Sequence, residues 1–159
     1  MQLLYEIVQE TVLLPLYFFL GQVVSDKAVF GNRVRSGLWL TAGIWTALAV
    51  ALSAFARPLL GWMAAASNII EASVTYIRIE SFANIFATLF SFALVALVTL
   101  GREKWLYVLT GVRLVLSILL DCLLLSSLPF SLRLGVNGIG WSNLATNGIL
   151  FAVALVLLA

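Results

Sequence analysis

Residues 68–101 read NIIEASVTYIRIESFANIFATLFSFALVALVTLG, a long apolar stretch without proline that decides the fold class. A helix advances about 100° per residue, so its regularly spaced polar side chains fall within an arc of roughly 120°. These side chains are Tyr76, Glu80, Asn84, Thr88 and Ser91. Because lipid offers no hydrogen bonds, we predict that this arc faces other helices or a water-filled cavity.

The neutral members of this polar stripe have two interpretations. Their hydrogen bonds can hold membrane helices together, or they can line a functional cavity. Glu80 is different, because a carboxylate inside the membrane is costly unless it is paired, protonated or hydrated. We therefore interpret Glu80, with Tyr76 and Asn84 one turn away on either side, as the first candidate for a cation-coupling or cavity site.

The composition indicates an integral membrane protein. Of the 159 residues, 63% are hydrophobic and 10% are charged, whereas soluble domains carry about 25% charged residues. The net charge of +2 gives no basis for nucleic-acid binding, and the chain contains no histidine, the usual general base and metal ligand. The sequence also has no paired-aspartate motif and no serine with a candidate base, so we expect neither an enzyme nor a bound cofactor.

Short polar breaks divide the chain into five apolar segments, each near or above the roughly 20 residues that cross a bilayer. The sequence thus predicts an all-α fold, a polytopic transmembrane bundle of five membrane-spanning helices that forms one unit over residues 1–159. The predicted helices are residues 3–24, 38–55, 69–100, 105–125 and 136–158.

The distribution of lysine and arginine predicts the orientation in the membrane. The breaks at 25–37 and 101–104 carry five cations, whereas the two opposite breaks carry only Arg57 and Arg133. The positive-inside rule therefore places the first two breaks in the cytoplasm of a multi-pass protein in the plasma (inner) membrane. The amino terminus then lies outside, which suggests that a preceding helix is missing.

Other polar side chains lie at membrane depth in the remaining segments. Asn143 and Asn147 are four residues apart and share one helical face, where they can either line the interior or make packing contacts. We add to the candidate list the following residues of the first, fourth and fifth segments: Glu10, Arg113, Asp121, Asn143 and Asn147.

Depth along the helices allows two arrangements of these charges. In one, Glu10, Glu80, Asn84 and Asp121 form a cluster in the outer half of the membrane that binds a proton or a small cation. In the other, Arg113 or the nearby Arg78 neutralises an acidic side chain in a static salt bridge. The sequence leaves both open.

Three motifs in order resemble one lobe of a multidrug and toxic compound extrusion (MATE) transporter. They are LPLYFFLGQVVSDKAVFGNRVRSG at 14–37, YIRIESFANIFATLFSFALVALVTLGREKWLYVLTGVRLVLSILLD at 76–121, and LGVNGIGWSNLATNGILF at 134–151. The resemblance covers nearly the whole chain. It implies helices two to six of a six-helix lobe, in a family of two lobes that exports organic, often cationic, compounds in exchange for sodium ions or protons.

The resemblance also implies what the chain works with: a small organic substrate, the lipid bilayer, the missing helices of its lobe and the second lobe. Family members commonly carry an acidic residue on a first helix that is absent here, and some carry an aspartate where this chain has Asn143 and Asn147. We therefore expect a fragment or truncated product that is active only with its missing parts.

Two alternatives remain. One is a flippase for lipid-linked precursors from the same broad superfamily, in which Arg78 and Arg113 would line the cavity. The other is a non-functional truncated product.

Overall fold

The computed structural model describes residues 2–22, 27–62, 67–125, 131–132 and 134–158, which form five α-helices and no strand. This confirms the predicted all-α fold. The helices are α1 (Gln2–Gly21), α2 (Lys27–Trp62), α3 (Ser67–Thr99), α4 (Lys104–Leu124) and α5 (Val136–Leu158).

Four of the described helices are long and apolar enough to cross a membrane. These stretches are Val29–Trp62, Ile70–Thr99, Lys104–Leu124 and Val136–Leu158. The described part of α1 contributes a shorter apolar stretch, Glu10–Gly21.

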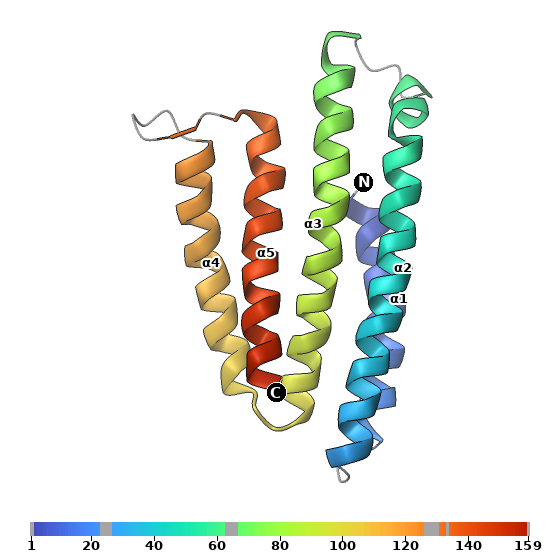
Figure 1. Ribbon diagram of the computed structural model, residues 1–159, viewed down its shortest axis with the longest axis vertical. Coiled ribbons are helices and arrows are strands. Elements are labelled where there is room, and N and C mark those ends of the chain that lie inside the picture. The colour runs from blue at the N-terminus through green and yellow to red at the C-terminus, as the bar shows by residue number, and fades with distance from the viewer. Residues whose placement is uncertain (1, 23–26, 63–66, 126–130, 133, 159) are drawn as a thin grey trace.

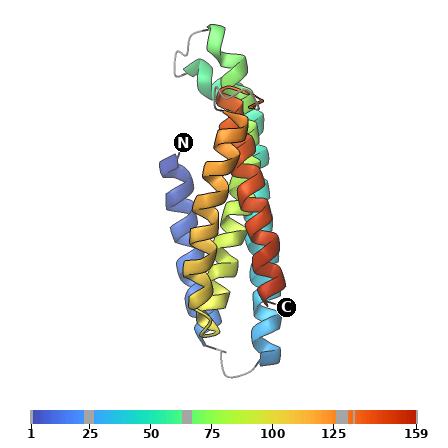
Figure 2. The same ribbon diagram turned by 90° about the vertical axis from the view of Figure 1, so that its left-hand side faces the viewer.

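Helix α3 is the centre of the bundle and contacts each of the other four helices. Figure 1 shows a row in the order α4, α5, α3, α2, in which α5 and α3 run in the same direction and the two outer helices, α4 and α2, run in the opposite one. Figure 2 views this row end-on, with α1 against one of its faces. The end of α1, the start of α2, the α3–α4 turn and the end of α5 lie together at one end of the bundle, which we call the lower end. The opposite end is the upper end.

Helix α2 is much longer than the sequence predicted. The predicted helix covered residues 38–55, whereas the observed helix runs from Lys27 to Trp62 and contains Pro58 in its last turns. A helix of 36 residues is about 54 Å long and exceeds the hydrocarbon thickness of about 30 Å. Most of the predicted polar break at 25–37 is therefore helix, because cations are tolerated in a helix that extends beyond the hydrocarbon.

A sharp turn at the lower end joins α3 to α4, at the short polar break that the sequence predicts at 101–104. Gly101 has a positive φ of 73°. The Gly101 amide donates to the Val98 carbonyl at 2.9 Å, and the Arg102 amide donates to the Leu97 carbonyl at 3.0 Å. This pair of bonds is the Schellman ending, which favours glycine at the left-handed position.

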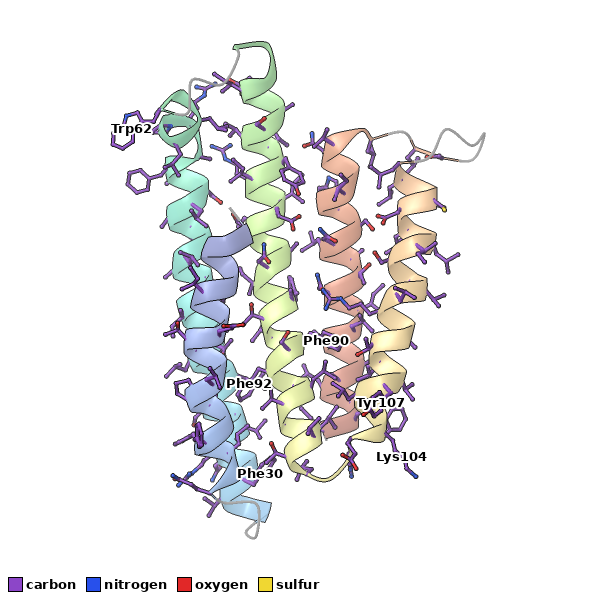
Figure 3. All side chains as sticks on the ribbon, turned by 180° about the vertical axis from the view of Figure 1, so that it is seen from behind. Phe30, Trp62, Phe90, Phe92, Lys104 and Tyr107 are labelled. Atoms are coloured by element: carbon purple, nitrogen blue, oxygen red, sulfur yellow. The ribbon has the colours of Figure 1, made fainter. Side chains whose placement is uncertain are left out.

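Large side chains on α3 pack against the helices on either side of it. Figure 3 shows Phe92 directed toward α1 and α2, and Phe90 directed toward α5. Phe92 joins a buried cluster with Leu16, Leu20 and Val34, whereas Phe90 packs with residues of α4 and α5. Lipid tails are as apolar as these side chains, so close van der Waals packing stabilises this arrangement.

Candidate functional site

A carboxylate on α3 is bound by an amide on α5. The Asn143 Nδ2 donates to both carboxylate oxygens of Glu80, at 3.1 and 3.2 Å. Both side chains are half-buried. Glu80 lies ten residues beyond the start of the apolar stretch at Ile70, which is about 15 Å along the helix axis. The hydrogen bond therefore lies within the depth of the membrane.

Glycine allows the two helices to meet at this point. A Cβ added at Gly140 would lie 2.9 Å from Cγ2 of Ile79 and 3.8 Å from the backbone nitrogen of Glu80. Small residues at membrane helix interfaces permit such close backbone approach. Asn143 follows Gly140 by three residues on the same side of α5, so its amide reaches the Glu80 carboxylate.

The neutral polar stripe of α3 is satisfied mainly within its own helix. Asn84 Nδ2 donates to the Glu80 carbonyl at 2.9 Å, Thr88 donates to the Asn84 carbonyl at 3.0 Å, and Ser91 donates to the Ala87 carbonyl at 2.9 Å. Side-chain bonds to the carbonyl four residues earlier are typical of polar residues within helices. The donors of these three side chains are therefore used within α3 itself.

Helix α5 adds buried oxygen atoms next to Asn143. Ser142, Thr146 and Asn147 are at most 5% exposed. The hydroxyl oxygens of Ser142 and Thr146 and the amide oxygen of Asn147 have no hydrogen-bond partner among the described residues. Ser142 and Thr146 are not among the candidates predicted from the sequence. The signal was present in SNLATN, which repeats a polar pair at an interval of four residues.

The family model named MatE matches residues 25–123, which is more than half of the chain and covers α2, α3 and nearly all of α4. The chain belongs to the MatE family. No curated protein and no solved structure gives a match. With its long apolar helices, this MATE chain is an integral, multi-pass membrane protein of a transporter family.

The matched part of the MATE chain includes Glu80, Asn84 and Asp121, whereas α1 and α5 lie outside it. The most specific polar contact, between Glu80 and Asn143, therefore joins a matched helix to an unmatched one. Asn143, the amide partner of Glu80, lies outside the residues matched by the family model, and its contact is known from the structure alone.

The predicted cluster of Glu10, Glu80, Asn84 and Asp121 does not form in the described residues. Helix α1 contacts α2 and α3 but neither α4 nor α5 in this part of the chain, so exposed Glu10 and half-buried Asp121 are on separate helices that do not meet. No three acidic side chains come together among the residues searched. The number of residues from a helix end predicts the depth of a side chain in the membrane. It does not predict the direction in which that side chain points.

The alternative salt bridge is not formed either. Arg78 and Arg113 are exposed, and within the described residues the carboxylate of Glu80 has Asn143 as its hydrogen-bond partner and no cation paired to it. The ion pair that the described residues do contain joins Arg57 of α2 to Glu71 of α3, near the upper end. Tyr76 lies half-buried one turn before Glu80.

The site of this MATE chain therefore combines one carboxylate with amide and hydroxyl oxygens. Oxygen ligands of this kind suit hard cations, and a lone carboxylate inside the membrane can also carry a proton. Glu80 is the only member that changes charge. Its occupancy by a cation or a proton would alter the hydrogen bond that connects α3 with α5.

Proposed function

We propose that the chain is part of a secondary active transporter that exports organic, often cationic, compounds in exchange for sodium ions or protons. The observation that carries this proposal is the hydrogen bond between Glu80 and Asn143 within the membrane. Membership of a transporter family supports the transport activity, and the carboxylate supplies a group whose charge can respond to an ion gradient.

Coupling requires that the ion interacts differently with two states of the protein. In our proposal, Glu80 without a bound cation accepts both contacts from Asn143 and holds α3 against α5. A sodium ion or proton on the carboxylate competes with the amide and weakens that connection. Tyr76, Asn84 and Asn147 are proposed to line the same region, and Asp121 and Glu10 are the second and third candidates for the coupling carboxylate.

Alternating access works by the movement of one helical bundle against another around a fixed site. We therefore propose that the chain acts with further helices of its own lobe and with a second lobe. We also propose that α1 spans the membrane, that the membrane is the plasma (inner) membrane, and that the lower end is cytoplasmic. An impermeant maleimide should label Lys104→Cys in a Cys122→Ser background from the inside only.

Transport by the full transporter, with its further helices and second lobe, in proteoliposomes with an imposed sodium or proton gradient tests the coupling role. Glu80→Gln keeps the shape but removes the charge, so gradient-driven efflux of ethidium should fall about tenfold or more, within the range of typical coupling free energies. Ethidium binding should change much less. Glu71→Gln is the matched control, because it removes an exposed carboxylate from the same helix.

Full activity of Glu80→Gln together with loss of activity in Asp121→Asn would move the coupling site to α4. If Glu80→Gln, Asp121→Asn and Glu10→Gln all transport normally, these three carboxylates are not the coupling site.

A further inference from the structure

A cavity of about 540 Å³ lies at the lower end, between the start of α2, the α3–α4 turn and the end of α5. Its lining combines two cations with apolar side chains and contains no acidic side chain among the described residues. The residues that carry the argument are Arg35, Arg102, Phe30, Val34, Leu38 and Leu158. None of the candidate coupling residues lines this cavity, so it is separate from the site on α3 and α5.

The two arginines have donors available for an anion. Arg102 Nη1 donates to the Leu157 carbonyl at 2.6 Å, which holds its guanidinium at the end of α5, and a guanidinium has further N–H groups to offer. Arg35 is exposed and has no described hydrogen-bond or ion-pair partner within the resolved helices. Neighbouring Arg33, by contrast, is already engaged by the ring and carbonyl of Phe19.

The cavity lies at the depth of lipid headgroups. Trp39 follows Arg35 by one turn on α2 and is 72% exposed, as is typical of a tryptophan at a membrane interface. The charged rim at Arg35 is thus on the aqueous side of the interface, and the apolar wall formed with Leu38 continues toward the hydrocarbon. Apolar contacts with this wall would stabilise a bound acyl chain but not a small soluble anion.

We propose that this cavity binds one anionic phospholipid. Its phosphate lies between the guanidinium groups of Arg35 and Arg102, and the upper part of an acyl chain lies against Val34 and Leu38. Basic pockets between membrane helices recognise anionic headgroups in this way, through charge and apolar contact together. The two arginines and the lack of an acidic partner for them in the described part of the lining favour an anionic lipid over a zwitterionic one.

The test compares spin-labelled phosphatidylglycerol with spin-labelled phosphatidylcholine bound to the chain in phosphatidylcholine vesicles. Each basic residue near the surface contributes about fivefold to the attraction of an anionic lipid. Arg35→Gln should therefore lower the preference for phosphatidylglycerol by about fivefold, and the double variant with Arg102→Gln should abolish it. Arg35→Gln alone suffices if loss of the Arg102 contact with α5 impairs folding.

Lys104→Gln is the matched control, because it removes one charge from the same end but from α4, away from Phe30 and the cavity (Figure 3). An equal loss of preference in Lys104→Gln would overturn the proposal in favour of general surface charge. Retention of the preference in Arg35→Gln and in the double variant would also overturn it.

Two further arms separate a lipid from other occupants. A Cβ at Gly31 meets no atom within 4 Å, so Gly31→Leu should fill the cavity and block an acyl chain while both arginines remain. Loss of lipid binding in this variant supports a lipid. Unchanged binding, together with displacement of the lipid by millimolar inorganic phosphate, would indicate a soluble-anion site and overturn the proposal. Disulfide-linked dimers of Gly31→Cys would instead indicate a second chain and overturn it as well.

Discussion

The two sides of α3 differ in how they hold a neighbouring helix. Toward α2, the packing is mainly apolar: Trp45, Leu52, Ile85 and Leu89 form one buried cluster, and the ring of Phe92 packs directly on Gly37. The polar groups described on this side are the exposed Arg57–Glu71 ion pair and the buried hydroxyl groups of Thr41 and Ser53. Toward α5, the lower half is apolar, but the upper half contains the Glu80–Asn143 hydrogen bond and several buried hydroxyl and amide oxygens.

The difference indicates a division of roles. Apolar packing in a membrane is tolerant and costs no desolvation, so the α2 side serves as permanent structure. A polar interface within the membrane is expensive and persists where function requires it. The α5 side therefore combines helix packing with the proposed ion coupling, and the following substitutions compare the two sides directly.

The largest effect on stability is expected from Asn143→Leu. It leaves the Glu80 carboxylate without its amide donor, and an unsatisfied hydrogen bond to a charged group costs about 1.5–3 kcal/mol. Unfolding by SDS titration in mixed micelles should show this loss in stability. Asn32→Leu, the same change at an exposed position on α2, should have little effect.

Combining Asn143→Leu with Glu80→Leu should restore most of the stability, because replacing both partners with apolar groups can be nearly neutral. Additive losses in the double variant would show that the two side chains contribute independently.

A smaller effect is expected from adding one methyl group at either glycine contact. A Cβ at Gly37 would lie 2.5 Å from Cζ of Phe92, and a Cβ at Gly140 would lie 2.9 Å from Cγ2 of Ile79. Overpacking costs about 1–3 kcal/mol, and the better helix propensity of alanine recovers up to about 1 kcal/mol. Thermal unfolding in detergent should show a loss for both variants, larger for Gly37→Ala because Phe92 is fully buried.

Gly43→Ala and Gly148→Ala provide controls in the same two helices, since a Cβ at either position meets no atom within 4 Å. Their stability should be unchanged or slightly increased. Gly140→Ala should also lower gradient-driven transport, because it separates Asn143 from Glu80, whereas Gly37→Ala should affect stability alone. Equal effects of the two variants on transport would remove the proposed distinction between the two sides of α3.

The smallest effect is expected from Arg57→Gln. Its ion pair with Glu71 joins α2 to α3 near the upper end, but the two side chains are 66% and 72% exposed. Exposed ion pairs contribute about 0–1 kcal/mol and are screened by salt. The variant should unfold within about 0.5 kcal/mol of the parent protein, with a difference that shrinks at high ionic strength. A larger loss would show that this pair, and not apolar packing, holds the α2 side.

Hydropathy predicted the helical class and most helix positions, because long apolar runs have few alternatives in a membrane. It failed at α2, where Lys27, Arg33 and Arg35 were interpreted as a loop although they continue the helix. The sequence also could not predict which residue pairs with Glu80. Glu80 and Asn143 were both candidates, but their contact depends on the approach of α5 at Gly140, which periodicity does not contain.

Arginines at the lower end also connect helices in pairs. The Arg33 guanidinium on α2 donates to the Phe19 carbonyl in the last turn of α1, and Arg102 after α3 donates to the Leu157 carbonyl at the end of α5. Each cation thus satisfies a carbonyl that a helix end leaves without an intrahelical partner. Separation of α1 from α2, or of α5 from the α3–α4 turn, would have to break one of these bonds. Among the described residues no such bond crosses from α2 to α5. The seam between the two pairs, where the lipid cavity lies, is therefore closed by apolar packing, in which Phe30 and Val34 of α2 share a buried cluster with Phe92 of α3.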